Sequence, residues 1–143
     1  MSTIFKPNIL ILDTSTNTCS LALLSNQQIY TFHETHGTGR IRHNEQVIPA
    51  FQSLLNSAGI SAQELTQIYF GHGPGSFTGC RMSASFAQGL AAGANIPCYS
   101  LSSFGLLAQG IYKNLKHTHI AIAQDAQKGQ IYFGLYQLDP DLN

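Results

Sequence analysis

The chain has 143 residues, carries seven Lys or Arg and seven Asp or Glu, and has a formal net charge of zero at pH 7. Charged residues make up only 10% of the sequence, against roughly 25% in an average globular protein, so we expect part of the surface to be covered by another body. Without a basic excess or a Lys/Arg cluster, an independent nucleic-acid binder is disfavoured.

The three cysteines lie far apart and form no C-x-x-C pair, which argues against a zinc knuckle and against a disulfide framework. The six histidines show no H-x-x-x-H or H-E-x-x-H spacing, so we predict no metal site. The apolar run Ile9–Leu12 is too short for a signal peptide, and no stretch is long enough to span a membrane. We therefore predict a cytoplasmic protein without membrane association.

The first part of the chain predicts a three-stranded antiparallel meander. Apolar or β-branched runs occupy Asn8–Leu12, Cys19–Leu24 and Ile29–Phe32 and are separated by polar turns, the pattern of successive strands. A polar stretch from His33 to Arg42 has no periodicity and predicts a surface loop.

A helix is predicted from Asn44 to Ala58, because apolar residues recur there at the spacing of one helix face. Asn44 is a candidate N-cap and Gly59 a candidate C′ residue. Ser61 and Glu64 have the spacing of a capping box before a strand at Thr66–Phe70.

The stretch Gly71–Arg81 is a glycine-rich turn that leads from this strand into a second helix, predicted from Phe77 to Gly93. Glycine lets a backbone or an anion approach closely, and the N–H groups at a helix start can hold a phosphate. A tight turn that fits between two packed layers is the alternative, and without a lysine we favour it. Ser76 does not match the G-x-S-x-G spacing of a hydrolase nucleophile.

Two stripes run along this second helix. Met82, Phe86 and Leu90 form one, and the small residues Ser83, Ala87 and Ala91 form the other. Small side chains on a second face allow close approach of a neighbour. We expect the helix to be covered on both sides, with one of its neighbours supplied by another body.

The last third predicts a strand at Pro97–Ser100, a helix at Ser102–Tyr112, and a hairpin of His119–Ala123 and Gln130–Leu138 across the turn Gln124–Gly129. A two-stranded ribbon is marginal on its own. We therefore expect either that the chain is a fragment or that the hairpin packs against a partner.

Asp13 follows the first strand, where α/β sheets bind ligands. With Thr14 and Ser15 behind it, and with Gly73 and Gly75 in the glycine-rich turn, Asp13 could hold a magnesium-phosphate group. Equally, its side chain could cap the turn. Both interpretations stay open.

Four phrases together resemble the TsaB (YeaZ) family, the accessory subunits for threonylcarbamoyladenosine (t6A) in tRNA. They are residues 11–15 (ILDTS), 43–49 (HNEQVIP), 73–82 (GPGSFTGCRM) and 124–132 (QDAQKGQIY), the last departing from the family wording at Gln127. The resemblance implies an α/β, actin-like ATPase (ribonuclease H-like) fold, consistent with the β-β-β-α-β-α-β order predicted above, followed by the first hairpin of a second similar domain. Because family members are longer, it also implies that the chain consists of an amino-terminal domain, residues 1–100, and the start of a truncated second domain, residues 101–143.

The resemblance also implies a paralogue, TsaD, which transfers the threonylcarbamoyl group and carries an H-x-x-x-H metal motif. The corresponding place here is Ser102–Leu107, which has no histidine or carboxylate. Hydroxyls and leucines do not replace imidazoles as ligands, so we expect no catalytic residues in this chain and no cofactor of its own. ATP or ADP with Mg is expected only in the complex.

Family dimers pack their first two long helices together, which agrees with the expectation of a second neighbour for the small-residue helix. We place a partner surface at Gln46, Ala50 and Ser53 on the first helix and at Phe77, Arg81, Ser83, Ala84, Ala87, Gln88 and Ala91 on the second.

The implied function is a non-catalytic subunit that dimerises with TsaD and activates it. The resemblance also implies that TsaE joins the larger complex and that the chain forms a homodimer when it is alone. It implies contact with tRNA only through the complex. The alternative function is an ATP-binding enzyme of the same fold that uses Asp13 and the Gly73–Gly75 turn.

Overall fold

The computed structural model describes residues 7–35 and 43–139. Its elements are β1 (Ile9–Asp13), β2 (Thr18–Ser25), β3 (Gln28–Thr35), α1 (His43–Ala58), the 3-10 turn η1 (Ala62–Glu64), β4 (Gln67–Gly71), α2 (Phe77–Ala94), β5 (Cys98–Leu101), α3 (Ser103–Leu115), β6 (His119–Gln127) and β7 (Gln130–Gln137). The predicted β-β-β-α-β-α-β order through β5 is confirmed. Most of the predicted loop between His33 and Arg42 lies outside the described residues.

The first five strands form one sheet in the order β3-β2-β1-β4-β5. The pairs β1–β2 and β2–β3 are antiparallel, whereas β1–β4 and β4–β5 are parallel. The carboxyl ends of parallel strands meet at one edge of a sheet. The turn after Asp13 and the glycine-rich turn after Gly71 therefore lie next to each other.

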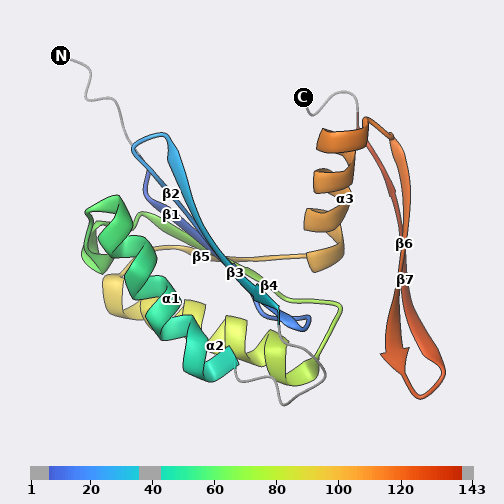
Figure 1. Ribbon diagram of the computed structural model, residues 1–143, viewed down its shortest axis with the longest axis horizontal. Helices are drawn as coiled ribbons and strands as arrows, with labels where there is room; N and C mark the ends of the chain where they lie inside the picture. The colour runs from blue at the N-terminus through green and yellow to red at the C-terminus, as the bar shows by residue number, and fades with distance from the viewer. Residues whose placement is uncertain (1–6, 36–42, 140–143) are drawn as a thin grey trace.

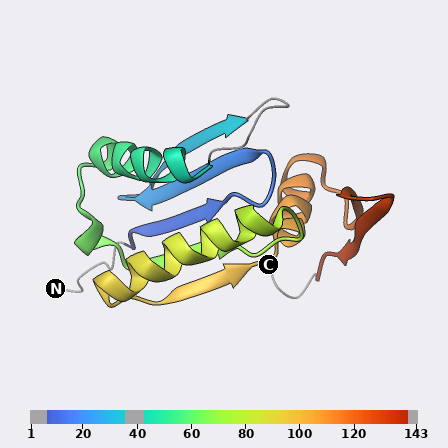
Figure 2. The same ribbon diagram turned by 90° about the horizontal axis from the view of Figure 1, so that it is seen from below.

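Helices α1 and α2 lie side by side on one face of this sheet and begin at the same end of it (Figures 1 and 2). Alternate residues of β1 and β2, among them Leu10, Leu12, Leu21 and Leu23, point into the core beneath the helices. α1 packs on β2 and β3, and α2 packs mainly on β4 and β1. This alternation is what a sheet with one helix-covered face requires.

The ends of α1 follow the sequence signals with one change. The helix begins at His43, one residue before the predicted start at Asn44. At the other end Gly59 has φ of +67°, and the N–H of Ile60 donates to the Leu55 carbonyl at 3.1 Å, as in a Schellman motif. The capping box is also confirmed, because the Ser61 N–H donates to the Glu64 carboxylate.

The last third of the chain forms a separate layer. α3 begins just beyond the end of β5, and the β6–β7 hairpin lies on its far side (Figure 1). A small core of Phe104, Ala108 and Ile122 joins helix and hairpin. The division into two domains remains a prediction. No helix in the described ranges 7–35 and 43–139 is long and apolar enough to cross a membrane.

The hairpin differs from the prediction at its turn. Gln127 pairs with Gln130, so the turn consists of Lys128 and Gly129, and residues 124–127 belong to β6. Both turn residues have positive φ, 53° and 73°, as a two-residue turn of type I′ requires. A lysine in the left-handed region is an uncommon choice, which is why the sequence suggested a longer turn.

Candidate functional site

The turn after β1 is held to the first turns of α2 by hydrogen bonds. Thr14 is fully buried; its N–H donates to Ser83 Oγ at 2.9 Å, and its hydroxyl donates to the Gly79 carbonyl at 2.7 Å. The Ser76 N–H donates to the Ser15 carbonyl at 2.6 Å. Two segments more than 60 residues apart are thus joined through main-chain groups.

Glycines make this close contact possible. A Cβ at Gly75 would overlap the Ser15 carbonyl, and a Cβ at Gly79 would overlap the Thr14 carbonyl. Gly73 has φ of +96°, a conformation that L side chains rarely adopt. The glycine-rich turn therefore fits against the chain's own backbone, which favours the packed-turn interpretation over phosphate binding.

Asp13 lies half-buried at the end of β1 and makes two hydrogen bonds. Its Oδ1 accepts from the Ser15 N–H at 2.7 Å, and its Oδ2 accepts from the Ser103 hydroxyl at 2.6 Å. A Cβ at Gly71 would overlap this carboxylate. The first bond confirms the predicted turn cap, and the second ties β1 to the first residue of α3.

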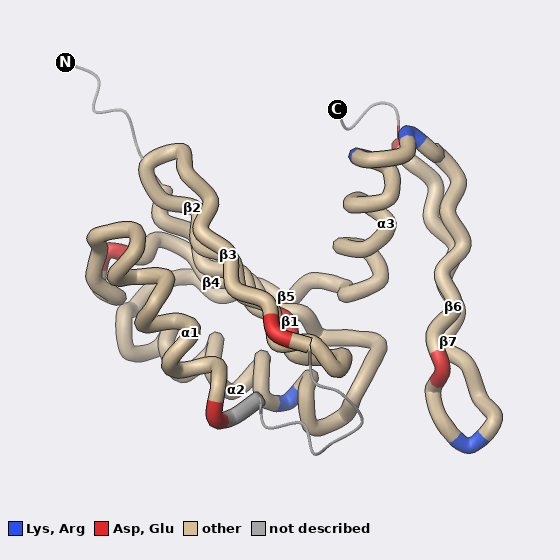
Figure 3. Tube along the Cα trace, in the orientation of Figure 1, with Lys and Arg blue, Asp and Glu red and all other residues tan. Residues whose placement is uncertain are grey.

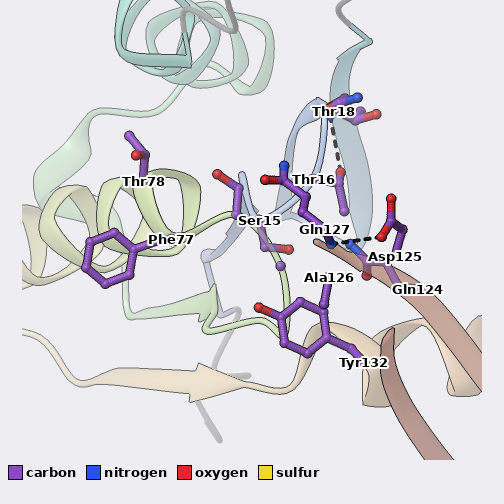
Figure 4. A pocket seen from close by; sticks show the side chains of 13 residues that line it. Ser15, Thr16, Thr18, Phe77, Thr78, Gln124, Asp125, Ala126, Gln127 and Tyr132 are labelled. Carbon is purple, nitrogen blue, oxygen red and sulfur yellow. Dashed lines mark hydrogen bonds between the residues drawn. The ribbon is translucent and has the colours of Figure 1, made fainter. Parts of the chain in front are cut away.

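A cleft of about 740 Å³ opens beside this junction (Figure 4). One wall comes from the turn after β1 and the start of α2, and the other comes from the hairpin. The lining residues are Ser15, Thr16, Asn17, Thr18, Gly75, Ser76, Phe77, Thr78, Gln124, Asp125, Ala126, Gln127 and Tyr132. The volume falls in the range of small-molecule sites. Among the described residues of the lining, Asp125 is the only one with a carboxylate.

The residues predicted for a nucleotide lie close together but are used differently from the prediction. Asp13 and Thr14 do not line the cleft, and the hydroxyl of Thr14 bonds within the protein. Ser15 and Gly75 do line it. Gly73 is buried beside Cys80. This arrangement leaves the hydroxyls and amides of the cleft walls and the Asp125 carboxylate as the groups that could meet a ligand.

Cys80 is not an activated thiol. Burial, with a smaller contribution from the negative charge of Asp13, raises the pKa of its thiol above the usual value. A raised pKa lowers the thiolate fraction, and the thiolate is the nucleophile. The Cys80 sulfur lies 3.0 Å from the place that a Cβ at Gly73 would occupy, so this side chain fills the space behind the glycine.

The predicted partner surface needs a correction. Ala50, Ser83, Ala87 and Ala91 are at most 5% exposed and belong to this chain's own interior. The small stripe allows α2 to approach β4 and the turn after β1. The other stripe packs toward α1, where Phe86 meets Phe51 edge to face at 5.5 Å. Both sides of α2 are thus covered within one chain.

The remaining six residues of the predicted partner surface stay accessible. Ser53, Phe77, Arg81 and Gln88 are exposed, and Gln46 and Ala84 are half-buried. The Arg81 guanidinium lies 3.9 Å from the centre of the Phe77 ring, a cation–π contact. These six residues remain a prediction for a partner surface.

Sequence reasoning missed the residues that form most of the cleft. Thr16, Asn17 and Thr78 are polar residues at turns, and nothing in the pattern distinguished them from solvated surface. Gln124–Gln127 belonged to the predicted turn, and only the two-residue turn at Lys128 and Gly129 could have revealed them as strand. Ser103 was considered only as part of a segment, Ser102–Leu107, that has no histidine or carboxylate to bind a metal.

Comparison with known protein families gives a match over most of the chain. The family profile described as TsaD, tRNA N6-adenosine threonylcarbamoyltransferase, matches residues 27–141. A tRNA N6-adenosine threonylcarbamoyltransferase of Christiangramia forsetii is 28% identical over 109 residues, covering 68% of this chain and 32% of that protein.

Proteins called tRNA threonylcarbamoyladenosine biosynthesis protein TsaB are more similar. The Escherichia coli protein is 35% identical and the Bacillus subtilis protein 37% identical, each over 131 residues. These alignments cover 92% and 90% of this chain but only 55% of each relative. The chain thus spans about half the length of the relatives that it matches.

A solved structure agrees with these matches. YeaZ from Pseudomonas aeruginosa superposes with a TM-score of 0.86 at 35% identity, covering 94% of this chain and 62% of that one. The five-stranded sheet therefore has the predicted actin-like, ribonuclease H-like fold, and the chain belongs to the TsaD family, in its TsaB (YeaZ) group.

Proposed function

We propose that this chain is a non-catalytic subunit in the biosynthesis of threonylcarbamoyladenosine in tRNA and that it pairs with TsaD and activates it. Similarity to TsaB proteins over about nine tenths of the chain carries this proposal. In the same proposal the chain forms a homodimer when alone, TsaE joins the larger complex, and tRNA is reached only through that complex in the cytoplasm. Any ATP or ADP with Mg belongs to the complex.

The residues at the place of the TsaD metal motif support a non-catalytic role. Ser102 accepts from the Gly105 N–H at 3.1 Å and caps α3. Ser103 donates to Asp13, and Phe104 is buried in the core that joins α3 to the hairpin. Each of these side chains thus has a structural contact of its own.

The outer surface of α1 and α2 supports pairing with another protein. Ile48 on α1 and Phe77 on α2 are 53% and 69% exposed, and nothing lies within 4 Å of the place where a Cβ of Gly89 would be. Each helix carries a single charged residue, Glu45 or Arg81 (Figure 3). Apolar side chains with few charges are typical of the centre of a protein interface.

The test is binding of this chain to TsaD encoded by the same genome, measured by co-purification and by calorimetry. We expect the unchanged chain to bind and Phe77→Asp to weaken binding at least about tenfold, because a charge would be buried at an apolar contact. Ile29→Asp is the matched control, since Ile29 is 70% exposed on the edge strand β3. Absence of binding, or equal binding of Phe77→Asp, would contradict the proposal.

Restoration of the modification is the second measurement. Cells depleted of their own TsaB would receive this chain, and the threonylcarbamoyladenosine content of digested tRNA would be quantified by mass spectrometry. We expect restoration by the unchanged chain and by Ile29→Asp, and loss of restoration by Phe77→Asp.

A second candidate function is binding of Mg-nucleotide in the cleft, which its volume favours. Calorimetric titration with Mg-ATP tests this candidate. Ala126→Trp should abolish the heat by filling the cleft, whereas Ala121→Trp should not, because Ala121 is an exposed residue of β6 outside the lining. No heat with the unchanged chain would remove this candidate.

A further inference from the structure

Hydrogen bonds between the sheet and α3 meet at one side chain, Ser103. Its hydroxyl donates to Asp13 Oδ2 at 2.6 Å and accepts from the Gly73 N–H at 3.2 Å. Its own N–H donates to the Gly73 carbonyl at 2.9 Å. The Ser15 hydroxyl lies 3.1 Å away, so the turns after β1 and after β4 both reach this serine.

The chemistry of these groups makes the arrangement directional. A hydroxyl has one proton and can accept further hydrogen bonds. Since the proton of Ser103 goes to Asp13, the Ser15 hydroxyl must be the donor in their contact. The Asp13 carboxylate also faces the first residue of α3, where negative charge is favoured by the helix dipole. Replacing either Asp13 or Ser103 would therefore remove more than one bond.

The two walls of the cleft belong to the two groups of elements that this serine joins. The first wall comes from the turn after β1 and the start of α2, and the second comes from the hairpin. The hairpin is held to α3 by the Phe104 core and by the Ser102 hydroxyl, which lies 3.4 Å from the Tyr136 hydroxyl. Where α3 sits relative to the sheet therefore determines how far apart the walls are.

We infer that Asp13 and Ser103 are positioning residues that fix the width of the cleft. They act by holding the start of α3 against the turns after β1 and β4. This role concerns the geometry of the chain and does not depend on which ligand or partner the protein takes.

The experiment measures the distance across the cleft in the full chain. Spin labels are attached at Thr78→Cys on α2 and at Lys128→Cys in the hairpin turn, both exposed positions, with Cys80 and Cys98 changed to alanine. Cys19 is 0% exposed and stays. Electron–electron resonance then gives the distribution of label distances.

We expect Ser103→Ala and Asp13→Ala to broaden this distribution about twofold or to shift its mean, because hinge-like motion of α3 and the hairpin is released. Ser103→Thr keeps the hydroxyl and should restore the narrow distribution. Leu107→Gly is the matched control. Leu107 is 51% exposed on the same helix, so this change lowers helix stability through the poor helix propensity of glycine but removes no hydrogen bond to the sheet or to the hairpin.

Circular dichroism and thermal unfolding establish that each variant is folded at the temperature of the measurement. A distribution for folded Ser103→Ala that matches the unchanged chain would overturn the inference. So would equal broadening in Leu107→Gly, since the effect would then follow helix stability and not the link to the sheet.

Discussion

Two serines in the interior are equally buried but differ in whether their hydroxyl groups have hydrogen-bond partners. Ser25 and Ser83 are both 0% exposed. The Ser83 hydroxyl accepts from the Thr14 N–H and contacts the Thr14 hydroxyl at 2.8 Å. The Ser25 hydroxyl has no hydrogen-bond partner among the described residues. A buried polar group without a partner destabilises a fold, whereas a partnered one contributes to it.

We therefore predict opposite effects of the same substitution. Ser25→Ala should raise the free energy of unfolding by about 1 kcal/mol, and Ser83→Ala should lower it by about 1–3 kcal/mol because Thr14 loses its partner. Urea denaturation measures both. A loss of stability in Ser25→Ala would show that its hydroxyl is satisfied in solution.

Gly79 gives a second prediction at this scale. Gly79→Ala should lower the free energy of unfolding by about 1–3 kcal/mol, because its Cβ would meet the Thr14 carbonyl. Gly89 lies in the same helix with open space around it, so Gly89→Ala should raise stability by up to about 1 kcal/mol through helix propensity. Equal effects of the two changes in urea denaturation would contradict the packing described for Gly79.

Local contacts of single residues could be predicted from the sequence, and distant ones could not. The turn cap at Asp13 involves Ser15, two residues away, and was one of the two predicted interpretations. The bond to Ser103 spans 90 positions and depends on how α3 follows the sheet. No spacing rule reports such a contact, so the second role of Asp13 appears only in the folded chain.

For helix α2, the sequence predicted the first and last residues well but did not predict which stripe packs on the sheet. The helix runs Phe77–Ala94, one residue longer than predicted. Two adjacent stripes, one large and one small, are compatible with either side facing the sheet. The buried contact of Ser83 with Thr14 decides the orientation, and it depends on a turn outside the helix.

This orientation changes the expected result of a substitution in the helix. Ala87 is 0% exposed in the core, so Ala87→Glu should unfold the chain and not merely separate a dimer. An unpaired buried carboxylate costs several kcal/mol, comparable with a total stability of about 5–15 kcal/mol. The neighbouring Gln88 is exposed, and Gln88→Glu should remain folded. Circular dichroism distinguishes the two, and a folded Ala87→Glu would contradict this packing.

For the whole molecule, the two groups of elements have cores of very different size. Among the residues that the structure describes, fourteen buried apolar residues lie between the five-stranded sheet and its two helices, whereas three lie between α3 and the hairpin. Stability within a protein follows such differences in buried apolar contact. If the predicted division near residue 100 is right, α3 and the hairpin should therefore be less stable than the sheet with its two helices.

Native-state hydrogen exchange measures this difference as the free energy with which main-chain amides open to solvent. The main-chain amides of β6 and β7 should open with a smaller free energy than those of β1 and β2. Phe104→Ala should remove protection from the hairpin, since Phe104 is one of the three residues in its core, at a cost of about 3–5 kcal/mol. The amides of Leu10 and Leu23 should keep their protection, because their core does not contain Phe104. Loss of protection in every strand together would mean that the chain unfolds as one cooperative unit and that the two-domain division is wrong.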